Sequence, residues 1–322
     1  PYRVNIAAVK NLAHRFVKTE LVSSPRSPPA VFDDIFRLCA LHCSTITHVC
    51  DHLARPDYPS LNTVHRKLAV LDADSVAEVI NSRLSDIVTH AKQLGFIPRK
   101  KRVDLAIDCT DLPYYGDPNT AGVVGGKPKK STKWFFRFAT ICIVENGYRF
   151  PLGVVPVDQF KTSNMTGVVT DLLDMACEHV SVRVLLMDRG FHSVRLFRTL
   201  KERGVSWLMP AKRTKRVSDA MNELVEAAES RRPMSRRIVV TGDDGKEEES
   251  VTLMVEWSEK KNRWWGWLSD RKRKVKRYRK RWGIETKYRD VNRVRGWTTS
   301  KKWVVKMMLY GFGVLMLSLI HI

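Results

Sequence analysis

The chain has 322 residues, of which 43% are apolar. It can therefore bury a large core and fill two or three domains of ~100–200 residues each, which excludes a disordered tail. Its 56 Lys and Arg residues outnumber 34 Asp and Glu residues, giving a formal net charge of +22. This surplus favours nucleic acid as the partner, with an anionic membrane as the second choice. A ribosomal protein or a secreted basic protein would have a similar charge, so the composition indicates a partner but no reaction.

Residues 1–100 are predicted to form an all-helical domain, because apolar residues recur at spacings of three and four. The spacing is clearest at residues 32–38 and 76–87, and a stretch rich in Pro and Ser at 24–29 separates the first helix from the next. The chain begins with Pro1 rather than Met, so we expect that residues before it are missing.

Six cysteines are scattered along the chain without a CxxC pair, which indicates neither a zinc ribbon nor a disulfide framework and favours a reducing cytoplasm. Three of them share residues 39–52 with three histidines, and this cluster could supply metal ligands. The same stretch is typical of an amphipathic helix, in which Cys serves as a small apolar residue. We expect the helix rather than the metal site.

The segment 46–68 has the pattern of a helix-turn-helix motif. A helix at 46–53 and a short turn with proline precede a second helix at 60–68, for which Ser60 is a suitable N-cap. The second helix would present these polar residues to a DNA groove: Asn62, His65, Arg66 and Lys67. The alternative is an ordinary bundle in which the same side chains face solvent, and both interpretations stay open.

Strands and helices alternate after residue 102. The predicted elements are strands at 103–109, 134–144 and 148–157, a helix at 165–179, a strand at 182–187, a helix at 193–203 and a strand at 205–209. An antiparallel meander of three strands followed by helix, strand, helix and strand is the element order of the ribonuclease H fold. We predict an α/β fold with a ribonuclease H-like mixed sheet and flanking helices.

A glycine-containing stretch at residues 122–128 invites a nucleotide-binding interpretation. It lacks the spacing of a P-loop, however, and has Pro128 where Ser or Thr is needed. Together with Lys129 and Lys130, it is interpreted as a mobile basic loop near DNA.

Residues 211–270 interrupt the alternation and are interpreted as a mostly β insertion domain, with a charged helix near 218–230 and strands at 237–241 and 251–257. The predicted domains are 1–100 (helical), 101–210 together with 271–322 (ribonuclease H-like, catalytic) and 211–270 (insertion).

Basic residues fill nine of the eleven positions 271–281 and lead into a long helix that we expect to reach about Arg293. Residues 303–322 are almost wholly apolar and long enough to span a bilayer. Glycines within this stretch and Lys306 near its start favour a core helix packed on a sheet. Its abrupt apolar end at Ile322 suggests that further residues are missing.

Two strand-end carboxylates are candidates for catalysis. Asp108 lies near the end of the first strand, and Asp188 ends the strand at 182–187. An acidic residue at the tip of a buried strand is costly unless it is hydrogen-bonded or binds a cation. One such Asp is usually a cap or a turn former, but two on neighbouring strands favour a cation site. Asp104 and Asp111 are the nearest substitutes for Asp108.

A third carboxylate, Glu285, shares a helix face with Tyr278 and Arg281, because they are spaced by three and four residues. A lone Glu among so many cations could simply neutralise them. Alternatively, an acid beside a phenol and a guanidinium suits a site that binds a metal and a phosphate together.

At these residues the chain resembles the IS-four group of insertion-sequence transposases, which have a Tyr-Arg-Glu-Lys signature. Tyr278, Arg281 and Glu285 match its spacing. The motifs at 108–110 and 188–191 are similar to the two Asp motifs of that family, which also carries a mostly β domain where this chain has its insertion.

The resemblance covers roughly residues 102–319 and implies that Asp108, Asp188 and Glu285 are catalytic and hold two Mg²⁺ or Mn²⁺ ions. One ion would activate water or a 3′-hydroxyl, and the other would stabilise the leaving oxygen. The same site would cut the transposon end and then join the freed 3′-hydroxyl to target DNA. Tyr278 would thus contact DNA rather than act as a nucleophile.

One position departs from the family signature. The signature Lys should stand seven residues after Glu285, where this chain has Asn292. Arg289 and Arg293 lie on or next to the same face and could replace it. The resemblance also implies that a Trp in the insertion stacks on a flipped base, for which Trp265 is the candidate, although such residues commonly belong to a core or a strand face.

The expected function is cut-and-paste transposition by a homodimer on double-stranded DNA, in the cytoplasm and without a membrane. One alternative is a non-catalytic DNA-binding protein derived from a transposase, against which the presence of all three carboxylates argues. Another is a ribonuclease H-like nuclease without strand transfer. A basic membrane-anchored protein is the most remote.

Overall fold

The computed structural model describes residues 6–53, 56–98, 101–145, 148–242 and 245–322. N-terminal helices precede a mixed sheet with flanking helices, which confirms the predicted α/β class and is consistent with a ribonuclease H-like fold.

The N-terminal part consists of α1 (Ile6–Phe16), α2 (Pro29–Leu41), α3 (Ile46–His52), α4 (Leu61–Leu68) and α5 (Ala73–Gln93). The predicted N-cap of α4 is confirmed, because the Ser60 side chain accepts a hydrogen bond from Thr63 N at 3.4 Å. The single helix expected over residues 39–52 is wrong. The chain turns between α2 and α3, where Cys43 has a φ of 51°, and a left-handed residue cannot continue a right-handed helix.

Within the described residues, one continuous sheet contains β1 (Val103–Tyr114), β2 (Val123–Lys129), β3 (Thr132–Glu145), β4 (Tyr148–Val157), β5 (Val182–Leu186), β6 (Trp207–Pro210), β7 (Met234–Thr241), β8 (Glu248–Ser258) and β9 (Arg263–Ser269). The predicted meander is confirmed, since β3 pairs antiparallel with both β1 and β4. On the other side, β5 joins β1 and β6 joins β5, both in parallel.

The stretch expected to be a mobile basic loop forms strand β2 instead. β2 pairs antiparallel with β3, where Val124 lies opposite Phe135, and Val123 and Val124 are buried. Lys130 and Ser131 form the connecting turn with φ values of 48° and 62°. The sequence-based interpretation failed because glycine and lysine residues follow the two valines and hide the apolar signal of the strand.

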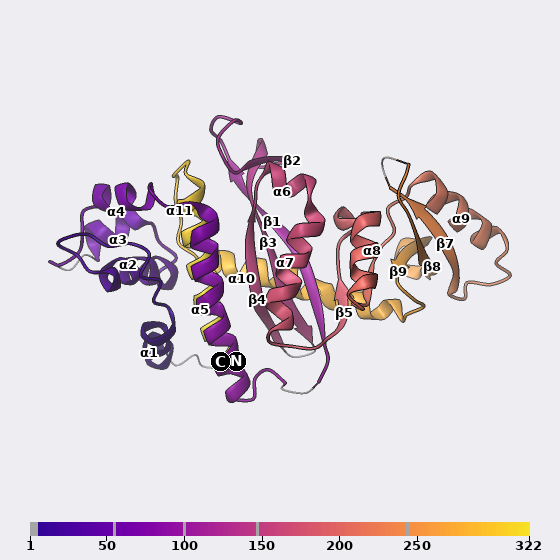
Figure 1. Ribbon diagram of the computed structural model, residues 1–322, viewed down its shortest axis with the longest axis horizontal. Coiled ribbons are helices and arrows are strands. Elements are labelled where there is room, and N and C mark those ends of the chain that lie inside the picture. Colours follow the sequence, from indigo (N-terminus) through magenta and orange to yellow (C-terminus); the bar gives the residue numbers. More distant parts are fainter. Residues whose placement is uncertain (1–5, 54–55, 99–100, 146–147, 243–244) are drawn as a thin grey trace.

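The segment 211–270 contains helix α9 (Lys215–Glu226) and strands β7–β9. β9 is not among the strands predicted from the sequence, and it pairs antiparallel with β6. The strands of this segment therefore extend the central sheet. The molecule is elongated, with α1–α4 at one end and α9 with β7–β9 at the other (Figure 1). The division into domains stays a prediction.

Strand alternation gives the two faces of the sheet different coverings. Leu105 and Ile107 of β1 belong to the main core, which also includes apolar side chains of α7 (Met165–Cys177) and α8 (Val194–Glu202). Ala106 belongs instead to a second apolar cluster on the opposite face. A short helix, α6 (Gln159–Ser163), connects β4 to α7.

The second cluster is covered by a 3-10 helix, η3 (Val275–Arg281), and by α10 (Trp282–Val294). The long helix expected after the basic run is present as α10, but Tyr278 and Arg281, which were expected on the same helix as Glu285, belong to the 3-10 helix η3. Like charges at helical spacing repel one another. Several side chains of this basic run form ion pairs with the sheet instead.

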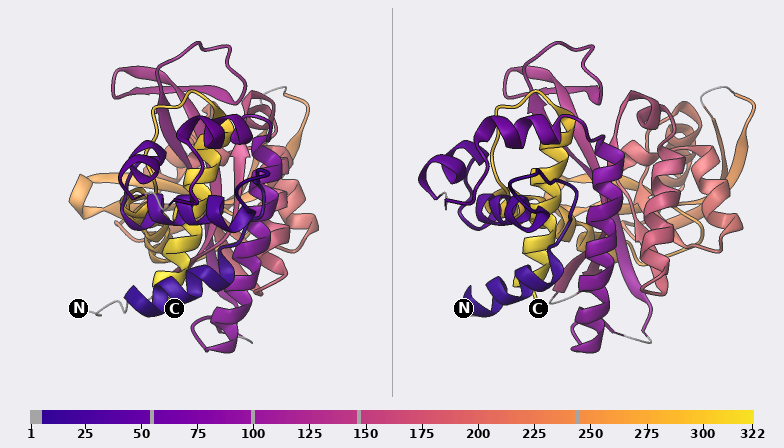
Figure 2. Two further views of the ribbon diagram at one scale, coloured as in Figure 1. Left: turned by 90° about the vertical axis from the view of Figure 1, so that its left-hand side faces the viewer. Right: turned by 60° about the vertical axis from the view of Figure 1, so that its left-hand side comes forward.

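Helix α11 (Trp303–Ile320) lies between the N-terminal helices and the sheet (Figure 2). Tyr310 stacks on Phe138 of β3 with ring centroids 4.7 Å apart, whereas Phe312 lies 5.2 Å from Phe36 of α2. In the described part of the chain, this is the one helix long and apolar enough to cross a membrane, and 83% of it is buried. The prediction of a core helix packed on a sheet is confirmed.

Asn81 of α5 joins the N-terminal helices to the outer edge of β4. Its Nδ2 donates to the carbonyl oxygen of Val154 at 2.8 Å, and its Oδ1 accepts from Val154 N at 2.9 Å. One side-chain amide thus satisfies both backbone groups of a strand residue that has no strand on that side.

We expect Asn81→Leu to lower the free energy of unfolding by about 2 kcal/mol, since it leaves two backbone groups of Val154 without partners. Urea unfolding followed by circular dichroism measures this loss. The control Asn62→Leu, at an exposed position of α4, should change stability by less than about 0.5 kcal/mol. Equal values for the two variants would contradict a structural role of the Asn81 amide.

Candidate active site

Strand β1 places Asp108 on the sheet face that η3 and α10 cover. Asp108 is two residues beyond Ala106, so alternation directs both side chains to the same face. The hydroxyl of Tyr288 on α10 donates a hydrogen bond to the backbone carbonyl of Asp108. This bond ties α10 to the sheet beside the predicted catalytic residue.

Arg281, the last residue of η3, lies between two of the three predicted carboxylates. Its Nη1 donates to Asp108 Oδ2 at 2.9 Å, and its Nη2 donates to Glu285 Oε1 at 2.6 Å. Arg281 is only 8% exposed, and hydrogen bonds between ionised groups are stronger than those between neutral groups. A single buried cation therefore holds Asp108 and Glu285 together.

Asp188 follows β5, which is the parallel neighbour of β1, as predicted. Its side chain accepts a hydrogen bond from Arg189 N at 2.7 Å and caps the 3-10 helix η1 (Arg189–Phe191). Burial raises the pKa of Asp108 to about 6, the charges of Asp188 and Glu285 add to this shift, and Arg281 opposes it. Asp188 and Glu285 thus both lie within electrostatic reach of Asp108.

The three carboxylates suit a divalent cation such as Mg²⁺ or Mn²⁺, which prefers oxygen ligands. Among the described residues, however, no group of three His, Cys, Asp or Glu side chains is positioned to hold a metal ion in this conformation. Arg281 supplies, between Asp108 and Glu285, the positive charge that a metal would otherwise bring. The donor set therefore has the chemistry for a divalent cation, but Arg281 occupies the position between Asp108 and Glu285 in this arrangement.

Tyr278 lies beside Arg281 and is only 8% exposed. Its ring packs 4.8 Å from that of Trp267 and 5.5 Å from the Arg281 guanidinium. Its buried hydroxyl has no hydrogen-bond partner among the described residues, and burial raises its pKa. The phenol is thus an unused donor next to the carboxylates.

Asp104 and Asp111, the predicted substitutes for Asp108, are neutralised by other partners. Asp111 accepts two hydrogen bonds from Arg137, at 2.7 and 3.2 Å. Asp104 is fully buried and accepts from Arg183 Nε at 2.6 Å and from Lys280 Nζ at 2.9 Å. Burial would raise the pKa of Asp104, but these hydrogen bonds lower it below its usual value.

A hollow of about 670 Å³ lies where the basic run meets the ends of β3 and β4. Its basic lining consists of Arg149, Lys274, Lys276, Arg277, Arg279 and Lys280. Trp282 also lines it and is 63% exposed. The run was predicted from the sequence, but Arg149 and Trp282 were not, because their proximity to the run depends on packing.

Trp265 of β9 borders another hollow, of about 250 Å³, which Arg189, Arg213 and Arg263 also line. The guanidinium of Arg263 lies 4.5 Å from the Trp265 ring centroid. These arginines were not predicted from the sequence, although Arg189 directly follows Asp188 in the Asp-Arg-Gly-Phe motif. An aromatic ring and three cations therefore stand close to the second carboxylate.

Asn292, which stands where the family signature has Lys, directs its side chain toward Arg295. Asn292 Oδ1 accepts a hydrogen bond from Arg295 Nε at 2.6 Å. Arg289 and Arg293, the predicted replacements, are exposed on α10 and remain available to an outside partner.

Arg66 and Lys67 lie on α4, at the end of the molecule opposite β7–β9 (Figure 1). Arg66 is exposed and Lys67 is half-buried, whereas Val64 and Leu68 are buried in the bundle as predicted. The structure does not bring these two basic residues to the carboxylates.

The family model described as the transposase DDE domain matches residues 99–318, more than half of the chain. The chain belongs to the DDE transposase family. The matched region contains Asp108, Asp188 and Glu285.

No curated protein matches this DDE transposase by sequence. Among solved structures, it has a distant likeness to the Drosophila P element transposase strand transfer complex, with 17% identity and a TM-score of 0.26. The likeness covers 54% of this chain and 36% of that chain, so this chain spans only about a third of that protein.

Asp104→Asn should destabilise the DDE transposase by about 3 kcal/mol at pH 7, because it removes one partner from a buried ion-pair network. The pKa of Asp104 is lower in the folded state, so its contribution is present above the unfolded pKa of ~3.9 and is lost as the pH falls further. Urea unfolding should therefore give a constant difference between wild type and variant from pH 7 to pH 5, and a smaller one at pH 3. A difference that grows on acidification would contradict this, and exposed Asp86→Asn is the control.

Proposed function

We propose that this protein is an insertion-sequence transposase of the IS-four group, which cuts transposon ends and joins them to target DNA. The observation that carries the proposal is the meeting of Asp108 and Glu285 on Arg281, with Asp188 in electrostatic reach. The finer assignment to the IS-four group rests on the spacing of Tyr278, Arg281 and Glu285.

Asp108, Asp188 and Glu285 are the residues that would hold two Mg²⁺ or Mn²⁺ ions. When bound, such ions activate water or a 3′-hydroxyl and stabilise the leaving oxygen of a phosphodiester. Asp108 must be ionised for this role, and burial opposes its ionisation. Arg281 favours the ionised form while it occupies the site.

Arg281 is proposed to exchange partners when DNA binds. A DNA phosphate offers its guanidinium the same charge-assisted hydrogen bonds that Asp108 and Glu285 provide. Once Arg281 has turned to the phosphate, both carboxylates are free for metal. The unused hydroxyl of Tyr278 lies beside Arg281 and can donate to the same phosphate, which makes Tyr278 a contact and not a nucleophile.

Other residues are proposed to bind DNA around this centre. Trp265 would stack on a base displaced from the transposon end, with nearby arginines holding its phosphate. Arg289 and Arg293 would take the place of the signature Lys. Arg66 and Lys67 would contact the duplex through α4, in a homodimer that assembles on DNA in the cytoplasm.

We expect Asp188→Asn to slow cleavage by more than about 100-fold while DNA affinity stays within about twofold. The variant loses one negative ligand of the catalytic site but no contact to a polyanion. The assay combines the DNA flanking the protein's own coding sequence with Mg²⁺ and follows each strand on a sequencing gel.

The matched control is Asp174→Asn, an exposed acid on α7 that pairs with Arg203, and it should cleave at the wild-type rate. Full cleavage by Asp188→Asn would reduce Asp188 to the cap of η1. Nicking without joining by the wild type would favour a nuclease, and binding without cleavage would favour a non-catalytic DNA-binding protein.

Arg281→Gln should raise the affinity for Mn²⁺ in the absence of DNA by roughly tenfold, because two charge-assisted hydrogen bonds no longer compete for Asp108 and Glu285. Titration calorimetry or the electron paramagnetic resonance signal of free Mn²⁺ measures this. The control Arg289→Gln removes an exposed charge from the adjoining helix α10 and should leave Mn²⁺ affinity nearly unchanged. Weaker or unchanged Mn²⁺ binding by Arg281→Gln would contradict the exchange.

A further inference from the structure

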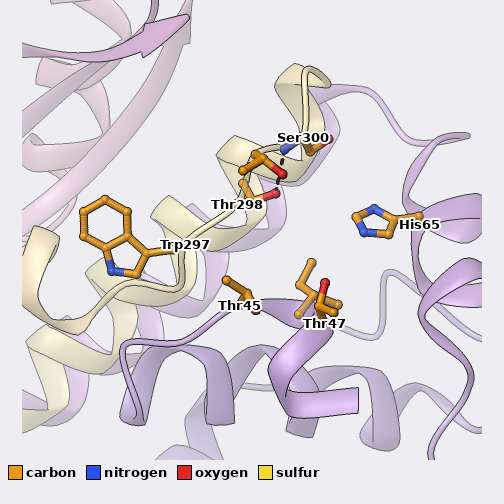
Figure 3. Close-up of a pocket in the computed structure, with 8 residues that line it drawn as sticks. Thr45, Thr47, His65, Trp297, Thr298 and Ser300 are labelled. Atoms are coloured by element: carbon orange, nitrogen blue, oxygen red, sulfur yellow. Dashed lines mark hydrogen bonds between the residues drawn. The ribbon is translucent and has the colours of Figure 1, made fainter. Parts of the chain in front are cut away.

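A cavity of about 330 Å³ lies where α3 and α4 meet the segment between α10 and α11 (Figure 3). No carboxylate lines it. Its wall is instead rich in hydroxyl side chains, contributed by Thr45, Thr47, Thr298, Thr299 and Ser300. His65, which the sequence analysis placed on the groove-facing side of its second helix, also lines the cavity, and none of the residues assigned to catalysis does.

The hydroxyl groups of this wall have hydrogen atoms left to donate. Thr45, Thr298 and Ser300 each accept a hydrogen bond from a backbone N–H, at distances between 2.9 and 3.2 Å. Their own O–H groups have no acceptor in the described part of the chain. Thr47 and Thr299 are exposed and form no side-chain hydrogen bond with any described residue. Such a wall suits a ligand that only accepts hydrogen bonds, as phosphate does.

Positive charge surrounds the wall. Lys306 Nζ donates to the Thr298 carbonyl oxygen at 2.8 Å, and the buried Arg295 guanidinium lies 4.7 Å from the ring centroid of Trp297, which lines the cavity. Burial, and then the charge of Lys302, lower the pKa of His65, which also lines the cavity. Arg295, Lys302 and Lys306 form no ion pair with any carboxylate in the described ranges. These cations therefore lack the counter-charge that an anion in the cavity would bring.

Helix α11 adds to the same potential. It begins at Trp303 without a side-chain cap, and its first turn contains no acidic residue. A helix N-terminus carries partial positive charge, which nearby acids normally offset. Lys302 and Lys306 stand there instead, so the local charge balance also favours an anion.

We propose that this cavity binds one phosphate group of the DNA backbone, an inference that rests on the proposed function in which DNA is the substrate. The first helix of a helix-turn-helix crosses the DNA backbone while the second enters a groove. Thr45 and Thr47 belong to the start of α3, and His65 belongs to α4. The cavity is thus where such a pair would meet a phosphate.

The same phosphate would contact both the helix pair α3 and α4 and the segment that follows α10. Trp297 N donates to the Ser44 carbonyl oxygen at 2.9 Å, and Thr45 forms a β-bridge with Trp297. The segment containing Trp297 directly follows α10, the helix of Glu285. DNA held by α3 and α4 would therefore be placed relative to the catalytic helix by one shared contact.

The test uses the full-length protein and a short duplex taken from the DNA that flanks its coding sequence. The double variant Thr47→Val/Thr299→Val keeps shape and charge and breaks no hydrogen bond of the protein. It should bind the duplex roughly tenfold more weakly in fluorescence anisotropy, the scale of a hydrogen bond to a charged group. Lys302→Gln should weaken binding and reduce the slope of log affinity against log salt concentration by about one unit. The control Lys10→Gln, at an exposed position of α1, should leave this slope nearly unchanged.

A scan of the duplex with single methylphosphonates identifies the contact. One neutralised phosphate should weaken wild-type binding, and the same substitution should have no further effect on Thr47→Val/Thr299→Val. The assignment would be overturned if every methylphosphonate weakened binding equally in the wild type and in the double variant. It would also be overturned if the double variant bound the unmodified duplex with wild-type affinity. A wild-type protein that binds no DNA would instead defeat the proposed function, so the two failures are distinguishable.

Discussion

The arrangement of the site depends on the guanidinium of Arg281, which offsets the repulsion between two carboxylates. Asp108 and Glu285 come from elements far apart in the sequence, and two carboxylates forced together in a buried place repel each other. Arg281 donates to both, so the end of η3, the start of α10 and the middle of β1 are held at one point. Without a cation at this point, burial of Asp108 would favour its protonated form.

Lys280, the residue before Arg281, fixes the direction of η3 across the sheet. Lys280 reaches Asp104 and Glu145, whereas Arg281 reaches Asp108. Asp104 and Asp108 are four residues apart on β1, or about 13 Å at the usual rise of a strand. Two adjacent basic residues thus span this distance by pointing in opposite directions. A helix fixed at two such points cannot slide along the strand, and Glu285 is held in place as a result.

Local periodicity explains what could be predicted from the sequence. Alternation revealed β1, β3 and β4, and acidic residues after apolar runs identified Asp108 and Asp188 before any contact was known. The expectation that Asp108 lies near a strand end is wrong, because β1 continues to Tyr114 through its pairing with β3. The pairing of β9 with β6 and the arginines around Trp265 could not be predicted, because they depend on contacts between distant segments. The basic run was misjudged for the opposite reason: its composition suited a helix, but ion pairs with Asp104 and Asp108 override local preference and leave η3 as a 3-10 helix.

The hydrogen bonds of Asn81 to Val154 also bear on how the sheet avoids self-association. An open sheet has two edges whose free backbone groups can pair with another copy. Helix α5 occupies the edge at β4, and β7 carries exposed Arg236 and Arg237 near the other. A chain shortened to begin after α5 would keep the charged edge and uncover the other. The N-terminal helices therefore cover an edge of the sheet that could otherwise pair with another copy, quite apart from any role on DNA.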